Sequence, residues 1–508
     1  MNMYSKIRKM VALFIFIAIF LSNSHFMLLK NDTEQNKEQY LLTEEKQTPH
    51  RSGYWKLGSI IIDGDATGVD AHNWTWFEDQ DWYGGGQGNW THPYIIENIS
   101  IDGEGKNAFT IKDSSVYFII RNCTFENSTG TGYALTLENV NNGTVTNCSI
   151  SNSGTGIYLT NSNNNTIVNN TISSITLNEA IRVWSNSDLN NITNNYISYI
   201  DNSNGIRINT DCDNNTLTNN FISYCSQDGI YLYLNNYNTI VQNIIFENYD
   251  GIHLQFRGKH RIKSNIIFNN THHGIEVEES DNNIFWDNLV NNNILHGIYF
   301  DHSENCTLTH NQFNGNGIFF VPSSMKELTS HNITKSNTVN DRVLYYYTNQ
   351  SNLMQNDFSN AGQVLLVNCN DSIIIGQNVS KNSMGIVLYY SRNITIKEND
   401  IFSIYYYGIY LFHSTNCSVI NNTGGDTYYS SIYLVDSHNN SVRDNKILDN
   451  ENYGIHIKNS NNCSLSHNNV TMCGENGIYL QESNNNTLYN NSSSKTEKIG
   501  SYLTKWTI

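Results

Sequence analysis

The chain places two aspartates, Asp228 and Asp250, at the same position of two nearly identical phrases 22 residues apart. If the phrases stack on one another, the two carboxyl groups lie about 5 Å apart. One of them would then keep its proton near neutral pH, or the two together would bind a cation. Carboxyl pairs at about this separation also serve retaining glycosidases. Asp-Gly is equally suited to ordinary turns, so a purely structural interpretation stays open.

The phrase that carries these aspartates recurs at an interval near 23 residues between Ala134 and Gly477. Each unit contains short alternating stretches of apolar residues separated by polar turns, which leaves no room for a helix. Alternation places two apolar columns inside the fold and the residue between them outside. Identical slots repeated at this interval predict a parallel β-helix, in which each coil pairs with the next.

The repeats predict an all-β fold, a single-stranded parallel β-helix of about 17 coils over residues 108–491. An open stack exposes unpaired strand edges, so we expect caps at both ends. Residues 51–107 are rich in Trp and have no repeat phase, which favours an N-terminal cap. Residues 492–508 would form a C-terminal tail or cap. The irregular stretch 318–384 is close to three periods long, which predicts three degenerate coils rather than an inserted domain.

One asparagine in each coil occupies a common slot and predicts a corner ladder. Asparagine tolerates the left-handed backbone of a sharp corner, and stacked amides can bond from layer to layer. The column contains Asn170, Asn195, Asn220, Asn243, Asn265, Asn288 and Asn311, and resumes with Asn399, Asn422, Asn445, Asn468 and Asn491.

Two cysteines, Cys123 and Cys148, occupy this same corner slot in adjacent coils, which predicts that they can form a disulfide after export. The nine cysteines as a set show no CxxC pairs and no metal-ligand spacing, so they indicate neither a disulfide scaffold nor a zinc site.

Charge and the N-terminus limit the partners and the compartment. The formal net charge of −17 argues against a nucleic-acid partner, which would require clustered Lys and Arg. Basic residues followed by an apolar run identify residues 1–29 as a signal peptide or an uncleaved signal anchor. Residues 30–50 form a polar linker. The rest of the chain is therefore expected to be extracellular or displayed on the cell surface, touching the membrane only through its N-terminal segment.

The outward slots between about residues 180 and 301 predict one polar face studded with aromatic rings. Such a surface can hydrogen-bond sugar hydroxyl groups and stack on sugar rings. The expected binding residues are Arg182, Trp184, Arg207, Tyr231, His253, Glu276 and Tyr299. The candidates for catalysis are Asp228, Asp250, His273 and Arg207.

A second, weaker candidate site lies in the expected cap. Asp63, Asp65 and Asp70 are spaced like the start of a calcium loop, but Trp74 stands where such a loop has its Glu. Calcium is therefore the one cofactor for which the sequence offers a candidate site.

Several blocks outside the repeats resemble a known family. Residues 88–103 and 115–125 are similar to the opening, and 337–353 and 361–369 to the middle coils, of NosD-like right-handed parallel β-helix repeat proteins. The resemblance implies a right-handed coil and an exported protein. The repeats themselves are shared with many β-helices that bind or cleave carbohydrate. NosD is associated with copper, but no Met or His-Cys cluster supports copper here.

These observations favour an exported, monomeric surface protein that binds glycans or envelope polysaccharide. Two alternatives remain. The face at 180–301 could serve a polysaccharide lyase, hydrolase or epimerase, or the rod could be a structural spacer or adhesin without catalysis. Whether carboxylate, Arg and His side chains converge on that face distinguishes these hypotheses.

Overall fold

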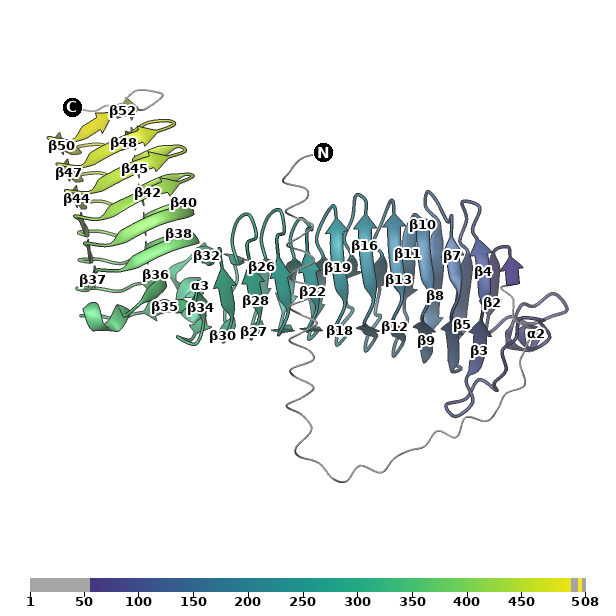
Figure 1. Cartoon of the computed structure of the whole chain (residues 1–508). Helices are drawn as coiled ribbons and strands as arrows, with labels where there is room; N and C mark the ends of the chain where they lie inside the picture. Colours follow the sequence, from purple (N-terminus) through teal and green to yellow (C-terminus); the bar gives the residue numbers. More distant parts are fainter. Residues whose placement is uncertain (1–54, 495–500, 505–508) are drawn as a thin grey trace, which may run out of the picture. The chain divides into compact units, whose positions relative to one another are not determined.

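The computed structural model describes residues 55–494 and 501–504, which form an all-β, right-handed parallel β-helix of about 17 turns (Figure 1). Equivalent slots of successive coils pair directly, as in Ile157 with Ile181 and Ile181 with Ile206. The predicted fold is thus confirmed. The segments expected as signal sequence and linker, 1–29 and 30–50, lie outside the described residues. Within the described part of the chain, no helix is long and apolar enough to cross a membrane.

Residues 55–339 form a first stack with three parallel sheets. One sheet contains β1 (Trp55–Leu57), β4 (Ile99–Asp102), β7 (Thr124–Glu126), β10 (Ser149–Ser153), β13 (Thr171–Ile175), β16 (Tyr196–Ile200), β19 (Phe221–Cys225), β22 (Ile244–Phe246), β25 (Ile266–Phe268), β28 (Leu289–Asn291), β31 (Gln312–Asn314) and β34 (Thr338–Val339). A second contains β3 (Tyr94–Glu97), β6 (Phe118–Arg121), β9 (Gly143–Thr146), β12 (Thr166–Val168), β15 (Asn191–Thr193), β18 (Thr216–Thr218), β21 (Thr239–Val241), β24 (Arg261–Lys263), β27 (Ile284–Trp286), β30 (Thr307–Thr309) and β33 (Asn332–Ile333).

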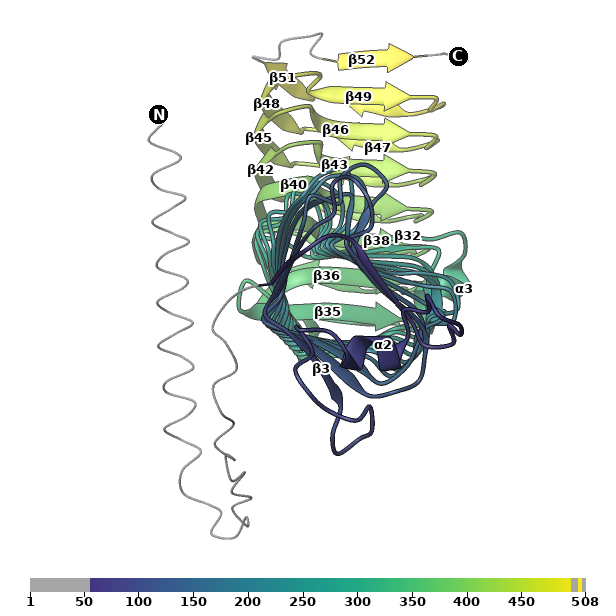
Figure 2. The ribbon, with the colours of Figure 1, turned by 90° about the vertical axis from the view of Figure 1, so that its right-hand side faces the viewer.

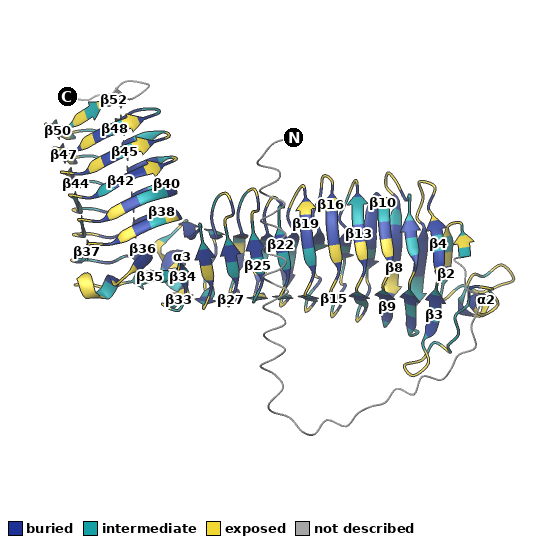
Figure 3. Cartoon of the chain, in the orientation of Figure 1, coloured by how far each residue is buried: buried dark blue, intermediate teal, exposed yellow. Residues whose placement is uncertain are grey.

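The third sheet of this stack carries the predicted face, and we refer to it as the site sheet. Its strands alternate between buried and partly exposed positions (Figure 3). It contains β2 (Ile60–Asp63), β5 (Phe109–Ser114), β8 (Tyr133–Val140), β11 (Thr155–Thr160), β14 (Ile181–Trp184), β17 (Ile206–Ile208), β20 (Ile230–Asn236), β23 (Ile252–Gly258), β26 (Ile275–Asp281), β29 (Ile298–Asp301) and β32 (Ile318–Val321).

A second stack begins at Arg342 and has its own hydrophobic core. One row of its strands contains β35 (Arg342–Thr348), β36 (Ala361–Val367), β38 (Asn378–Tyr389), β40 (Asp400–Phe412), β43 (Ser430–Val435), β46 (Tyr453–Lys458), β49 (Ile478–Gln481) and β52 (Ser501–Thr504). The others are β42 (Thr423–Thr427), β45 (Lys446–Asn450), β48 (Asn469–Cys473) and β51 (Ser492–Ser494), then β37 (Ile373–Ile375), β39 (Thr395–Lys397), β41 (Ser418–Ile420), β44 (Ser441–Arg443), β47 (Ser464–Ser466) and β50 (Thr487–Tyr489).

The stretch 318–384 is not three degenerate coils, as its length had suggested. It contains the helix α3 (Met325–Ser330) and the 3-10 helix η1 (Gln355–Phe358), and β34 pairs with β35 in the antiparallel sense. The chain reverses at this hairpin, so the second stack does not simply extend the first. Length alone could not reveal this, because an insertion of about three periods preserves the phase of the repeat.

The second stack closes the open end of the first. Its strands β35 and β36 cross that end in the view along the first stack (Figure 2). The side-chain amide of Gln363 accepts from the Ile318 backbone at 2.9 Å and donates to the Ile318 carbonyl at 2.8 Å, continuing the strand edge. The Tyr389 hydroxyl donates to the Phe320 carbonyl at 2.9 Å. The unpaired edge that an open stack would leave is therefore satisfied by the chain itself.

At the other end, residues 51–107 contribute more than a cover. Strands β1 and β2 pair in parallel with β4 and β5, so the coils already begin at Trp55. The helix α2 (Trp74–Glu78) buries Trp74 and Phe77 over the first coils, and Trp74 stacks on Tyr94.

The corner ladder consists of buried asparagines that bond from coil to coil. Asn243 is fully buried, donates to the Leu217 carbonyl at 2.9 Å, and accepts from the backbone and side-chain amides of Asn220. The left-handed residue of each corner is not the ladder asparagine but the residue before it, such as Gln242 with φ 56°. Asparagine is therefore needed here for its paired donor and acceptor rather than for its backbone freedom.

Candidate functional site

The outward slots of the site sheet form one continuous row. Strand pairing sets Arg182 beside Arg207, Arg207 beside Tyr231, and so on along the sheet. All six side chains are half-buried, so they contact one another as well as solvent. The row runs Arg182, Arg207, Tyr231, His253, Glu276 and Tyr299.

The arginines make the basic end of this row. The guanidinium of Arg182 lies 4.3 Å from the centre of the Trp184 ring, and that of Arg207 lies 4.9 Å from the Tyr231 ring. Behind them the buried carboxylate of Glu179 forms ion pairs at 3.6 Å and 3.4 Å. The Nε groups of both arginines are buried without a hydrogen-bond partner. The rings and the carboxylate therefore hold the two cations in place on the surface.

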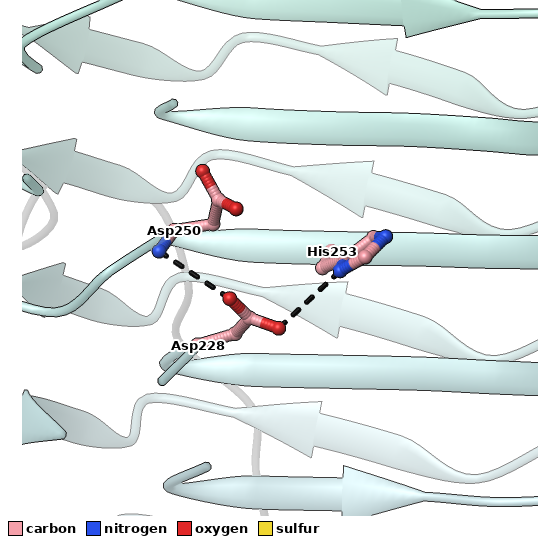
Figure 4. Close-up of side chains that lie close together, drawn as sticks. All are labelled: Asp228, Asp250 and His253. Carbon is pink, nitrogen blue, oxygen red and sulfur yellow. Dashed lines mark hydrogen bonds and ion pairs between the residues drawn. The ribbon is translucent and has the colours of Figure 1, made fainter. Parts of the chain in front are cut away.

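Asp228 and Asp250 are not turn residues at the surface. Both are buried, and each accepts from the backbone N–H one coil further on; Figure 4 shows this contact for Asp228. Asp228 Oδ1 accepts from Asp250 N at 3.4 Å, and Asp250 Oδ1 accepts from His273 N at 2.6 Å. One coil earlier, Asn204 plays the same role toward Asp228 N at 2.9 Å. The residues in the slot before each Gly thus form an internal ladder. The ladder explains why a short side chain with an acceptor oxygen stands at this position, but it does not explain why two of these side chains are charged.

The charge of the two aspartates is matched by histidines. Asp228 Oδ2 lies 3.3 Å from His253 Nδ1, and Asp250 Oδ1 lies 3.0 Å from His272 Nδ1. Burial raises the pKa of Asp228, although the His253 hydrogen bond opposes that shift. Burial lowers the pKa of His253, but Asp228 and the nearby carboxylates outweigh it and raise the pKa to about 9. His253 is therefore a cation at neutral pH.

Two further carboxylates complete the cluster around His253. Glu276 Oε2 lies 4.0 Å from His253 Nδ1, and Glu278 Oε2 lies 3.4 Å from His253 Nε2. Burial and the Asp250 charge raise the pKa of Glu276 to about 8. Gln255 links this group to the next ring, because it accepts from the Tyr231 hydroxyl and donates to Glu278 at 2.6 Å. Carboxyl, imidazole, amide and phenol groups thus converge in the middle of the face.

His273 lies apart from this chemistry. Its ring is buried, stacks on Tyr299 with centroids 4.4 Å apart, and accepts from His296 N through Nδ1. Burial lowers its pKa well below the usual value, and burial lowers that of His296 to about 3. The structure thus makes His273 a neutral packing residue, which leaves Asp228, Asp250 and Arg207 as the candidates from the sequence that touch the cluster.

The clusters that could hold a metal ion are confined to this face. Within the described residues, every group of three or more His, Cys, Asp or Glu with suitably close ligand atoms lies between Asp228 and Glu278. The expected calcium loop is not among these groups. Asp63 instead pairs with Lys112 at 2.7 Å and accepts from Asp65 N.

The two cysteines proposed to pair are free thiols in this structure. Cys123 and Cys148 are buried in adjacent coils, as the parallel pairing of β7 with β10 requires. The Cys148 thiol beside it and burial together raise the pKa of Cys123. The disulfide stays a prediction.

Two family models match the chain, and they divide it near the hairpin. The right-handed β-helix region matches residues 83–179 and 179–329, and the periplasmic copper-binding protein NosD matches 290–423 and 336–507. The chain is thus similar to right-handed parallel β-helix repeat proteins of the NosD type, and it has the fold of a right-handed parallel β-helix. No curated protein matches the sequence.

The name of the NosD family refers to copper, so we compared the positions of possible metal ligands with the residues that match this family. Among the described residues, the groups able to share an ion all lie before Glu279, outside residues 290–507. The five cysteines in the matched part are buried thiols. What this chain shares with the family is the right-handed β-helix.

Several solved structures are similar to this chain at low identity. The pectate lyase Pel9A is 13% identical with a TM-score of 0.35, and the match covers 56% of this chain and 80% of that one. The A-module of the Azotobacter vinelandii mannuronan C-5 epimerase AlgE4 is 13% identical with a TM-score of 0.27, covering 80% and 91%. A tailspike mutant of E. coli bacteriophage HK620 is 13% identical with a TM-score of 0.32, covering 59% and 57%.

Sequence reasoning missed two residues of the site. Glu179 is the buried partner of both arginines, and His272 pairs with Asp250. Glu179 occupies the slot before the repeat phrase, one coil ahead of Asn204, so the column itself contained the signal. No pattern singled out His272, because it lies in a turn that varies between coils.

Proposed function

We propose that this NosD-like chain is an exported, monomeric surface protein that binds polysaccharide along the site sheet between β14 and β29. The observation that carries the proposal is the row of half-buried guanidinium and aromatic groups from Arg182 to Tyr299. Export is supported by the basic and apolar N-terminal segment and by the periplasmic setting of NosD itself.

Several features of the row favour a sugar ligand. Trp184 and Tyr231 offer ring faces, and the arginines, Gln255 and Glu278 offer donors and acceptors beside them. Sugar rings combine apolar faces with hydroxyl groups, so a ligand needs both kinds of contact side by side. Because the arginines are already positioned by rings and by Glu179, little side-chain freedom is lost on binding.

The cluster around His253 favours a second candidate, a lyase or epimerase that acts on the same face. Groups with shifted pKa values in contact with one another are common where protons are transferred. Glu276, with its pKa near 8, could exchange a proton with a sugar at neutral pH. Release of an unsaturated sugar from a uronate polysaccharide would support this candidate, and its absence would leave binding alone.

The test is binding of the full chain to a panel of neutral and uronate polysaccharides. Arg207→Ala and Trp184→Ala should each weaken binding about tenfold or more, because each removes a cation–ring contact and a group offered to the ligand. Tyr479→Ala is the matched control, since Tyr479 occupies the same outward slot in the second stack. Retained melting temperatures show that the variants fold. Equal affinity in all variants would overturn the proposal.

A further inference from the structure

We propose that His253 Nδ1, together with the carboxylates of Asp228, Asp250 and Glu276, binds one divalent transition-metal ion of the zinc class. This site goes beyond the proposed polysaccharide binding and does not depend on it. It lies on β20, β23 and β26 and the turns before them, outside the part of the chain matched by NosD.

The ligand atoms converge pair by pair. One group brings Asp228, Asp250 and His253 together, with all ligand atoms within 4.8 Å of one another. A second joins Asp250 to Glu276, and a third joins Glu276 to His253 at the same limit. The ligand atoms of each pair among Asp250, His253 and Glu276 therefore lie within 4.8 Å of one another, so a modest movement of the side chains would bring them around one ion.

The parallel stacking of the coils produces this convergence. Asp228 and Asp250 share the slot before Gly, while His253 and Glu276 share the outward slot of adjacent strands. Figure 4 shows Asp228, Asp250 and His253 gathered at the start of two neighbouring strands. Because the coils are fixed by backbone pairing, the ligands are held without a flexible loop.

The second nitrogen of His253 is positioned as in a metal-bound histidine. Nε2 lies 3.4 Å from Glu278 Oε2, and Gln255 holds that carboxylate at 2.6 Å. The contact is long and does not satisfy the geometry of a full hydrogen bond, so Nε2 is otherwise unpartnered. When Nδ1 loses its proton on binding a metal ion, the proton that stays on Nε2 faces Glu278, which is the arrangement that orients metal-binding imidazoles.

The balance of charge also calls for a cation. Four carboxylates, Asp228, Asp250, Glu276 and Glu278, face two histidines, and Asp250 exposes only 1% of its side chain. Buried carboxylates in excess are costly unless a proton or a metal neutralises them. Metal binding should therefore release protons.

The ligand types select the class of ion. Calcium prefers six to eight oxygen ligands, whereas an imidazole among carboxylates suits zinc and similar first-row ions. The imidazole nitrogen and the three carboxylates proposed as ligands are enough for a four-coordinate site. We therefore expect zinc to bind more tightly than calcium.

The test is calorimetric titration of the full chain, first stripped with EDTA, with ZnCl₂ and separately with CaCl₂. We expect one zinc ion per chain with proton release, and calcium binding at least tenfold weaker. Glu276→Gln and His253→Gln should each weaken zinc binding by more than tenfold, and Glu278→Gln by about tenfold. Co²⁺ bound in place of zinc should give a visible spectrum that changes in Glu278→Gln, which a purely structural role of Glu278 would not produce.

The matched control is His456→Gln, because His456 occupies the same outward slot in the second stack with tyrosines on both sides. This variant should bind zinc like the parent chain. Thermal melting in EDTA identifies any variant that fails to fold. If either Glu276→Gln or His253→Gln fails to fold, the other variant alone tests the site. Three results would each overturn the proposal: no zinc bound, equal binding by Glu276→Gln and His253→Gln variants that fold, or calcium bound more tightly than zinc.

Discussion

The two stacks of the molecule share their corners and differ on their faces. Asn243 in the first stack and Asn445 in the second bond the coils before and after them in the same way. The outward slot differs, because in the first stack it holds the row from Arg182 to Tyr299, in which charged side chains are interspersed with tyrosines. In the second stack it holds Leu365 and Val387, which are buried in the core of the first stack, and then an aromatic column of Tyr410, Tyr433, His456 and Tyr479.

The difference shows that the frame and the chemistry of this fold are specified by separate residues. The inner columns and corner amides must repeat, since each coil satisfies the next. The outward slot has no such constraint and can carry ions in one stack and rings in the other. Function therefore has to be sought in the slots that do not repeat.

The strongest test of the shared frame is to break one ladder in each stack. Asn243→Leu and Asn445→Leu should each lower the free energy of unfolding by about 3 kcal/mol or more, because each leaves two donors of the preceding asparagine unpaired in a buried corner. Denaturant unfolding measures the loss. Asn191→Leu, at an exposed position of β15, is the control and should cost little.

Asn235 would not serve as that control. It is fully buried and donates to the Ile208 carbonyl at 2.8 Å. It therefore belongs to a further ladder, and Asn235→Leu should also be destabilising. A loss in Asn191→Leu as large as in Asn243→Leu would contradict the assignment of the ladder.

Oxidation should form a disulfide in the first stack but not between Cys417 and Cys463 of the second. Cys123 and Cys148 lie in adjacent coils, so their disulfide should form in an oxidising compartment and stabilise the first stack by about 2–4 kcal/mol. Cys417 and Cys463 lie two coils apart, about 10 Å on the rise of a parallel stack, and should remain unpaired. Peptide mass spectrometry without reduction measures both outcomes. Free thiols at Cys123 and Cys148 in the exported protein would disprove the first.

Acid should destabilise both stacks through buried histidines. Burial lowers the pKa of His260 in the first stack to about 3 and that of His456 in the second to about 4. A histidine whose folded pKa is depressed contributes stability above its unfolded pKa near 6.5, and this stability is lost as the pH falls from there toward the folded value. Stability should therefore fall below about pH 6.5.

His260→Asn isolates this effect in the first stack. His260 Nδ1 accepts from Asn238 N in a column of asparagines, so Asn restores the contact without the titrating group. The variant should match the parent chain at pH 7 and exceed it by roughly 2 kcal/mol at pH 5. His456→Gln should give a similar gain in the second stack, since the folded pKa values of both histidines lie below 5. Melting profiles that stay parallel between pH 5 and 7 would rule this mechanism out.

The smallest effect on stability concerns the aspartates themselves. Asp228→Asn with Asp250→Asn keeps an acceptor for the backbone N–H of the next coil, as Asn204 shows, and removes like charges from a buried column. The free energy of unfolding should change by less than ~1 kcal/mol or rise slightly. Ligand binding should weaken in the same double variant, and unchanged affinity would show that these charges have no functional role on this face.

The frame was predictable from the sequence and the join between the stacks was not. The columns beginning at Ile157 and Leu159 predicted the inward faces, because alternation and a constant interval leave one geometry. The hairpin at Thr338 was not predicted, because the stretch that contains it is close to three periods long and the repeats on either side of it therefore stay in phase. The hydrogen bonds of Gln363 with the backbone of Ile318 could not be predicted either, because they join distant parts of the chain.

The face was predictable only in part. Alternation correctly placed Arg207 and His253 on one outward row. For the slot before Gly the sequence left a turn and a functional pair open and did not predict the internal ladder in which Asp228 and Asp250 are buried. Asn204 in the same column was the available signal, because an amide and a carboxylate share one property, an oxygen that accepts from the coil beyond.

The seam at Gln363 bears on how the chain avoids self-association. A β-helix that ends in an open coil is a template onto which another molecule can add, coil upon coil, and grow into a fibre. Here that template is occupied by strands of the same chain, with Phe320 and Ile318 sealed beneath them. Loss of the second stack would expose this strand edge to other chains, so the join closes an edge as well as connecting the two stacks.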